Sequence, residues 1–224
     1  MAAIGDMFYT WAADADVLKK GECGGAITAL QQYALSSGMV DAVLAVRKGA
    51  DIYDAVPTFI TNPAEVAETA GSLHCGTLLL SKLVKDYLDS NKTARLGVTV
   101  KGCDTMGLIE LAKRDAVDLD RLILLGVNCG GSVSPVLARK MIREKFEVDP
   151  DLVHKEEIDK GQFIIEYEGG HKGIKIDDLE DEGYGRRSNC RRCLYKVPRQ
   201  ADLACGNWGV IGDKAGKATF VEVC

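Results

Sequence analysis

The sequence predicts an α/β protein built on a mixed, partly parallel sheet that is flanked by helices. Strand-like apolar runs alternate with segments of helical periodicity over residues 1–147, and such alternation is typical of parallel strands joined by helices. A strongly charged stretch over 148–187 then interrupts this pattern, and cysteine and glycine return over 188–224. We therefore expect an α/β region over 1–147, a charged β-hairpin insertion over 148–187 and a cysteine-rich region over 188–224.

Periodicity and turn residues define the elements of the first region. Residues 24–38 open on a Gly-Gly turn and continue with apolar side chains at helical spacing, and residues 40–46 read as a buried strand. Asn62 is a suitable helix N-cap, with Pro63 at the first helical position. The same criteria predict further helices over 78–88, 106–114 and 135–146, and strands over 95–100 and 121–127.

The two later regions contain shorter strand signals. Strand-like runs at 163–168 and 174–176 flank the glycine-rich residues 169–173, which predicts a surface hairpin. An apolar, strand-like run over 218–223 ends the sequence. Because a domain rarely stops directly after such a run, we expect the polypeptide to continue beyond Cys224.

Charge and hydropathy exclude several classes of protein. The 224 residues carry a formal net charge of −5, which does not supply the basic field that nucleic-acid binding needs. No window approaches the roughly 20 apolar residues of a membrane span, and residues 1–11 do not resemble a secretion signal. We expect a cytoplasmic protein, in which the eight cysteines serve as thiols or metal ligands rather than as disulfides.

Cys190 and Cys193 form a CxxC motif, a spacing that lets two thiolates bind one metal centre from a tight turn. On its own the motif fits a dithiol switch, a zinc site or an iron–sulfur cluster. A dithiol switch is expected to open a helix just after a strand, whereas a polar run precedes the motif here. The flanking arginines would offset the charge of a thiolate-ligated cluster, or they form a solvated basic loop: Arg186, Arg187, Arg191 and Arg192.

Three other cysteines are candidate ligands. Cys103 follows the strand predicted at 95–100, and Cys129 follows the strand at 121–127, so both stand at carboxyl ends, where open α/β sheets bind ligands. Cys205, like the other two, has a glycine neighbour that leaves room for a bulky cofactor. Each of them alone also fits a small buried hydrophobe, and zinc would use the same ligands. Five cysteines thus compete for four ligand positions.

Two glycine-containing segments are candidates for binding a nucleotide cofactor. The Gly24-Gly25 turn stands at a helix start, where free N–H groups suit a phosphate, although a plain capping turn fits equally well. Residues 71–77 combine small polar side chains with His74 and Cys75, which fit a nucleotide site or buried packing. No Ser–His–Asp or paired-carboxylate pattern stands out, so hydrolysis is not inferred.

Taken together, these motifs resemble the beta subunits of coenzyme F420-reducing hydrogenase and F420-dependent formate dehydrogenase. The resemblance runs nearly end to end, and residues 6–11 and 41–46 look closer to the formate dehydrogenase branch of methanogenic archaea. It is carried by Gly24, Gly25 and Thr28 and by the segments 71–75, 101–104, 126–131, 189–193 and 201–209.

The resemblance implies an electron-transfer oxidoreductase that binds FAD and a [4Fe-4S] cluster and exchanges electrons with its substrate, coenzyme F420. Cys190, Cys193 and Cys129 are the first choices as cluster ligands, and Cys205 is preferred to Cys103 as the fourth because it is nearer to the CxxC motif in sequence. No side chain is assigned a catalytic role, since hydride transfer would occur at the FAD. The implied flavin neighbours are Gly24, Gly25, Thr28, Ser72, His74 and Lys101.

The resemblance also implies partners. Formate oxidation would occur on a molybdenum or tungsten alpha subunit, and a heterodisulfide reductase flavoprotein subunit is a further candidate partner. Formate dehydrogenase beta subunits extend into a ferredoxin-like tail, in agreement with a chain that continues beyond Cys224. Two alternatives remain: the beta subunit of F420-reducing hydrogenase or a related ferredoxin-coupled reductase, and a zinc-stabilised binding module without catalysis.

Overall fold

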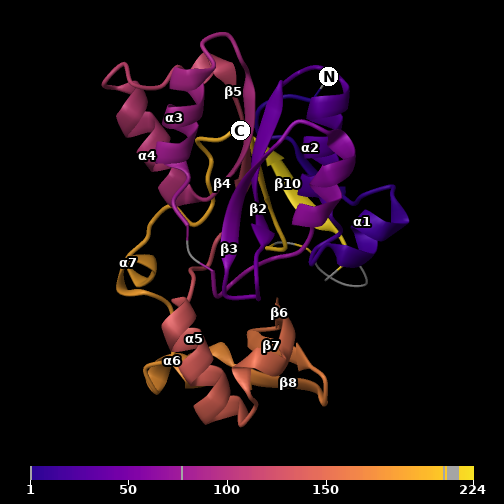
Figure 1. Cartoon of the computed structure of the whole chain (residues 1–224), viewed down its shortest axis with the longest axis vertical. Coiled ribbons are helices and arrows are strands. Elements are labelled where there is room, and N and C mark those ends of the chain that lie inside the picture. Colours follow the sequence, from indigo (N-terminus) through magenta and orange to yellow (C-terminus); the bar gives the residue numbers. More distant parts are fainter. Residues whose placement is uncertain (1, 77, 209, 211–216) are drawn as a thin grey trace.

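The computed structural model describes residues 2–76, 78–208, 210 and 217–224. Thr77 and Gly209, which belong to two of the motifs above, lie outside the described residues. The described strands form two separate sheets, a seven-stranded sheet in the order β1-β10-β9-β5-β4-β2-β3 and a three-stranded sheet in the order β6-β7-β8 (Figure 1). The strands are β1 (Met7–Thr10), β2 (Ala42–Lys48), β3 (Ala55–Ile60), β4 (Leu96–Val100), β5 (Leu122–Val127), β6 (Val153–Asp159), β7 (Gln162–Tyr167), β8 (Gly170–Lys175), β9 (Leu203–Gly206) and β10 (Thr219–Val223).

The centre of the large sheet is parallel. β2 pairs with β4, β4 with β5 and β5 with β9 in parallel, whereas β3 joins one side and β10 and β1 the other side in antiparallel pairing. The predicted α/β class with a mixed, partly parallel sheet is therefore confirmed. Because the carboxyl ends of parallel strands share one edge of the sheet, the residues that follow β4, β5 and β9 meet at that edge.

Helices cover both faces of the large sheet. In Figure 1, α3 and α4 lie on one side of the strands and α1 and α2 on the other, while α5 and α6 accompany the small sheet. No helix among the described residues is long and apolar enough to cross a membrane. The helices are α1 (Ala15–Lys20), α2 (Ala26–Ser36), α3 (Ser81–Ser90), α4 (Gly102–Ala112), α5 (Pro135–Met141), α6 (Ile176–Asp181) and α7 (Ser188–Arg191), with 3-10 turns at Pro63–Thr69, Leu119–Arg121 and Pro150–Leu152 and a π turn at Ile142–Phe146.

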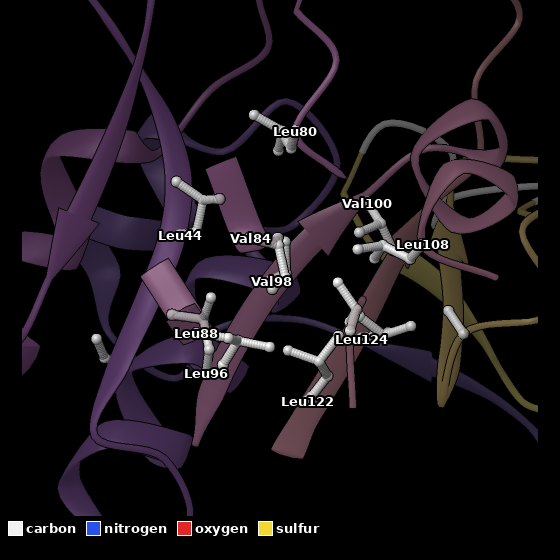
Figure 2. Close-up of a cluster of buried hydrophobic side chains, with 13 residues drawn as sticks. Leu44, Leu80, Val84, Leu88, Leu96, Val98, Val100, Leu108, Leu122 and Leu124 are labelled. Carbon is white, nitrogen blue, oxygen red and sulfur yellow. The ribbon is translucent and has the colours of Figure 1, made fainter. Parts of the chain in front are cut away.

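The main core lies between the large sheet and the pair α3 and α4. Leu44, Val98 and Leu124 project from three neighbouring strands toward leucine and valine side chains of the helix layer (Figure 2). The adjacent Val43 points to the opposite face, where it packs with Ala34 of α2, because successive side chains of a strand alternate between faces. Both Val43 and Leu44 are fully buried, as expected for a parallel strand covered on both sides.

Most predicted elements of the first region are confirmed, with shifted ends. Asn62 caps the Pro63 turn by accepting a hydrogen bond from the backbone N–H of Ala64, but this turn is a 3-10 helix. The helix predicted at 106–114 begins four residues earlier, at Gly102, because Asp104 accepts a hydrogen bond from the Lys101 backbone N–H and caps the first turn. The helix predicted at 135–146 ends in a π turn, and the strand predicted at 218–223 is β10.

The small sheet corrects the predicted hairpin. β7 and β8 pair so that Tyr167 faces Gly170, and a two-residue turn joins them instead of the five residues 169–173. Ile176 starts α6 rather than ending a strand, and β6 adds a third strand that was not predicted. The glycines at 170 and 173 conceal β8 in the sequence, since glycine disfavours a strand unless neighbouring pairing compensates. Phe163 and Ile165 of β7 form a second buried core with Phe146 and Leu179.

Candidate functional site

Two candidate ligands lie side by side at the carboxyl edge of the large sheet. β4 and β5 pair Val100 with Gly126, so Cys103 and Cys129 each follow a paired position by three residues. Cys103 lies in the first turn of α4, and Cys129 lies in the loop between β5 and α5. The prediction that both stand beyond strand ends is confirmed.

The CxxC segment packs against both of these strand ends. Cys190 lies in the short helix α7 and Cys193 follows it; the helix is preceded by a loop and not by a strand, which is not the context of a dithiol switch. The Cys129 backbone N–H donates to the Lys196 carbonyl at 2.8 Å. A Cβ atom on Gly102 would lie 1.7 Å from the Tyr195 carbonyl oxygen, so the close approach of this loop requires glycine at position 102.

Cys129 is the electrostatic link among four cysteines at this edge. Burial raises the pKa of Cys129, the Gly131 backbone N–H and Lys101 lower it, and the thiols of Cys190 and Cys193 raise it. The pKa of Cys103 is likewise raised, first by burial and then by Asp104, with Cys129 adding to the effect. Cys103, Cys129, Cys190 and Cys193 therefore form one group, which we call the cysteine cluster.

Cys205 is separated from the cysteine cluster by its place in the sheet. It lies inside β9, where it pairs with Val127 of β5 and with Val221 of β10, and its side chain is fully buried. Burial raises the pKa of its thiol to about 12, and the thiol that adds to this effect is Cys224 rather than a member of the cluster. Cys205 pairs with Val127, which precedes Cys129 by two residues, and this offset explains its separation from the cysteine cluster.

The described residues contain no preformed site for a single metal ion. Among the described residues, no three His, Cys, Asp or Glu side chains are close enough to hold a single metal ion. A zinc ion needs its four ligands within about 2.3 Å of one centre when they are thiolates, whereas the thiolates of a four-iron cluster each bind a different iron. Four thiolates are a ligand set that both kinds of centre use.

Lys101 belongs to the same edge. Its ammonium group donates to the fully buried Asp104 at 2.6 Å, and Asp104 also accepts from the Leu80 backbone N–H at 2.8 Å. Burial lowers the pKa of Lys101, but the charge and hydrogen bond of Asp104, with contributions from Cys103 and Cys129, outweigh burial and raise it. Lys101 thus lies beside the cysteine cluster.

The backbone conformation of the Gly24-Gly25 turn requires glycine. Both residues have positive φ, +83° and +68°, which glycine adopts at little cost. A Cβ atom on Gly25 would lie 2.7 Å from the Val17 carbonyl oxygen. The turn therefore has a structural reason for its glycines, in agreement with the capping alternative. It also leaves the first N–H groups of α2 without a side-chain cap among the described residues, so a phosphate could still bind there.

His74 and Ser72 lie next to this turn. The His74 Nε2 atom is 3.1 Å from Glu22 Oε1, and Ser72 also hydrogen-bonds the Glu22 carboxylate. The same carboxylate accepts from the Ile158 backbone N–H of β6 at 3.1 Å. Residues far apart in the sequence thus bring two of the predicted flavin neighbours to within a few residues of Gly24.

Glu156 of β6 forms hydrogen bonds with the 71–76 segment. One of its oxygens accepts hydrogen bonds from the His74 and Cys75 backbone N–H groups. The Glu156 side chain is 3% exposed, and its second oxygen is buried without a partner among the described residues. Cys75 is fully buried in the small core, which favours packing over cofactor contact for this residue. Nothing in the sequence around Glu156 or Glu22 marked them as partners.

Asn128 and Asn207 connect the two groups of candidate residues. Asn128 separates β5 from Cys129, and its side-chain carbonyl oxygen is buried without a hydrogen-bond partner among the described residues. Asn207 follows β9 and hydrogen-bonds the Cys23 thiol, next to the glycine turn. An orphaned acceptor at the carboxyl edge suits a ligand with an N–H donor, which the isoalloxazine ring of a flavin carries. Both asparagines stood inside motifs that the sequence singled out for their cysteines.

Two models of one protein family match almost the whole chain. The model described as "Coenzyme F420 hydrogenase/dehydrogenase, beta subunit N-term" matches residues 7–85, and the model for its C terminus matches residues 93–224.

Curated relatives point to the same family. The chain is 54% identical to F420-dependent formate dehydrogenase 1 subunit beta of Methanococcus maripaludis, over 98% of this chain and 56% of that protein. It is 52% identical to the F420-dependent formate dehydrogenase subunit beta of Methanocaldococcus jannaschii, over 95% and 55% respectively. Identity falls to 26% with the coenzyme F420 hydrogenase subunit beta of Methanococcus voltae, over 88% and 70%. The chain thus spans a little over half the length of the two formate dehydrogenase relatives.

A solved structure shares the fold. One chain in the F420-reducing [NiFe] hydrogenase complex from Methanosarcina barkeri superimposes with a TM-score of 0.83 at 20% identity, covering 99% of this chain and 76% of that one.

Proposed function

The chain belongs to the coenzyme F420 hydrogenase/dehydrogenase beta subunit family, and we propose that it is the F420-linked electron-transfer subunit of a formate dehydrogenase. The observation that carries the choice of branch is the identity of 54% and 52% to formate dehydrogenase beta subunits, against 26% to a hydrogenase beta subunit. The proposed partner is a formate-oxidising catalytic subunit that holds molybdenum or tungsten.

The proposed metal cofactor is a [4Fe-4S] cluster bound by Cys103, Cys129, Cys190 and Cys193. The pairing of Val100 with Gly126 places Cys103 and Cys129 at one edge, and the effects of Cys190 and Cys193 on Cys129 support this set. The place of Cys205 inside β9 argues for Cys103 as the fourth ligand. The Gly131 N–H, which hydrogen-bonds Cys129, would stabilise the thiolate form of that ligand. Lys101 would add a positive charge at the same edge.

The proposed flavin site is the carboxyl edge between the glycine turn and the cysteine cluster. The α2 N-terminus after Gly25 would hold a phosphate, and the orphaned Asn128 oxygen would accept a hydrogen bond from the ring. When bound, FAD supplies the exchange between hydride transfer with F420 and single-electron transfer. Ser72 and His74, held by Glu22, would form the wall beside the glycine turn.

A pair of matched variants tests the ligand set. Cys103→Ser removes a proposed ligand, whereas Cys205→Ser makes the same chemical change inside β9. After anaerobic purification we expect one complete cluster in the wild type, loss of most iron in the Cys103 variant and wild-type iron in the Cys205 variant. Measured iron, sulfide, zinc and flavin contents decide the result. Iron loss in the Cys205 variant alone would restore Cys205 as the fourth ligand, and zinc without flavin would overturn the redox function itself.

A further inference from the structure

Arg186, beside the cysteine cluster, uses all three guanidinium nitrogens in hydrogen bonds within the protein. Arg186 Nε donates to Glu180 Oε1 at 2.5 Å, and Nη2 donates to Glu180 Oε2 at 2.8 Å. The remaining guanidinium nitrogen, Nη1, donates to the Gly130 carbonyl at 3.1 Å. Bidentate arginine–carboxylate pairs have fixed geometry, so this side chain is oriented rather than freely solvated.

The stem of this arginine lies against the loop that carries Cys129 and next to Cys190. A Cβ atom on Gly131 would lie 2.5 Å from Arg186 Cδ and 3.0 Å from Cys190 Cβ. Arg186 and Cys190 therefore both lie against Gly131, two residues after Cys129. The charge of Cys190 also acts on the Arg186 guanidinium. Arg187, in contrast, is exposed to solvent.

The acidic partner comes from a different part of the chain. Glu180 lies in α6, directly after the small sheet, and its side chain is 16% exposed, against 31% for Arg186. The hydrogen bonds from Arg186 lower the pKa of Glu180 to about 2, so the carboxylate is charged throughout the neutral range. Arg191 and Asp177 are the other charged groups that act on this pair.

We propose that the Arg186–Glu180 pair sets the reduction potential of the cluster bound by Cys129 and Cys190, and that α6 of the small sheet region thereby tunes electron transfer at the large sheet. The inference rests on the proposed cluster. Reduction by one electron adds one negative charge to a thiolate-ligated cluster, so a nearby cation favours the reduced form and a nearby anion disfavours it. The pair supplies one charge of each sign, held at fixed positions.

Single and double variants separate the two charges. Arg186→Gln leaves the Glu180 carboxylate alone near the cluster, and we expect a lower reduction potential. Glu180→Gln leaves the guanidinium alone, and we expect a higher potential. The double variant should lie between the two, and Arg186→Lys, which keeps the charge, should stay closer to the wild type than Arg186→Gln. Arg187→Gln is the matched control, because it removes the same charge from an exposed neighbour.

The reduction potential is measured by anaerobic titration of the purified full chain with dithionite, monitored by electron paramagnetic resonance. Iron is counted in every variant. Opposite shifts in the Arg186→Gln and Glu180→Gln variants at wild-type iron content support the proposal. Equal shifts in the Arg186→Gln and Arg187→Gln variants, or shifts of the same sign in the two single variants, overturn it. A wild-type protein without iron would instead refute the proposed cluster, and with it this inference. If Arg186→Gln does not fold, the sign of the Glu180→Gln shift decides.

Discussion

His74 shows how a single side chain depends on partners from distant parts of the chain. Its ring nitrogen contacts Glu22, and its backbone N–H donates to Glu156. Burial by itself lowers the pKa of His74, but the hydrogen bond and charge of Glu22, together with the charges of Glu156 and Glu157, outweigh burial and raise it. The pKa of Glu22 is lowered, because the partners that stabilise its charge outweigh the opposing effect of burial.

The linked pKa shifts predict how stability depends on pH. A raised histidine pKa contributes stability that is fully present below the unfolded value of 6.5 and is lost as pH rises through the folded pKa. The lowered Glu22 pKa contributes stability above its unfolded value of 4.5, which is lost as pH falls through the folded pKa. We therefore expect the contribution of this pair to be largest between these two values.

The variant His74→Gln tests this linkage by urea unfolding between pH 6 and pH 8.5. The wild type should be the more stable protein at pH 6, and its advantage over the variant should shrink toward pH 8.5. The matched control is His171→Gln, which changes an exposed histidine of β8 and should lie parallel to the wild type. A constant difference between His74→Gln and the wild type over the whole range would contradict the prediction.

At the scale of elements, the two ends of α2 show two different reasons for glycine, namely a left-handed backbone and a lack of room for a side chain. Gly25 and Gly38 have nearly the same φ, +68° and +71°, but only Gly25 lacks room for a side chain, since nothing lies within 4 Å of a Cβ on Gly38. A left-handed residue with a side chain costs about 1–2 kcal/mol. A clash with backbone that cannot move costs roughly a further 1–3 kcal/mol.

Alanine substitution should therefore give two different losses of stability. We expect Gly38→Ala to cost about 1–2 kcal/mol, from the backbone conformation alone, and Gly25→Ala to cost clearly more. Chemical denaturation of both variants measures the difference. Equal costs would mean that the Val17 carbonyl moves aside freely. Flavin content of the Gly25 variant, measured in parallel, shows whether the turn also matters for the proposed cofactor.

Strand pairing explains which elements the sequence revealed. β2, β4 and β5 are continuous apolar runs because they are buried on both faces, and their positions were predicted within one or two residues. Charged residues in β6, and lysine and glycine in β8, occupy more than half of the positions, and only pairing with β7 makes these segments strands. The same pairing brings Glu156 to the 71–76 segment, which no local pattern indicates.

At the scale of the whole molecule, three separate clusters of buried side chains stabilise the fold. The main core lies between the large sheet and α3 and α4, a smaller cluster packs α2 on the opposite face, and the small core joins the small sheet to α5, α6 and the segment that contains Cys75. Figure 1 shows the small sheet beyond one end of the large sheet. The candidate site receives residues from both parts. Glu22 accepts a hydrogen bond from Ile158 of β6, and Arg186, which binds Glu180 of α6, donates to the Gly130 carbonyl beyond β5.

Cavities in the two cores should therefore have different local effects. Ile165→Ala in the small core and Leu108→Ala in the main core each remove a fully buried side chain and should each cost about 2–5 kcal/mol. Hydrogen exchange should increase over β6–β8 and residues 71–76 in the Ile165 variant, and over α4 and β4 in the Leu108 variant. Identical exchange patterns would show that the two cores unfold as one unit.

The sequence by itself determined the α/β class, the family and the five candidate cysteines, because periodicity, turn residues and motif spacing are local properties. The family resemblance is confirmed by models that match residues 7–85 and 93–224. Only the tertiary structure placed these cysteines relative to the sheet. Parallel pairing places Cys103 level with Cys129 and leaves Cys205 inside β9, whatever its distance from the CxxC motif along the chain. The partners of His74 and Arg186 were decided in the same way, because strand register and helix packing bring together charges that lie between 6 and 82 residues apart in the sequence.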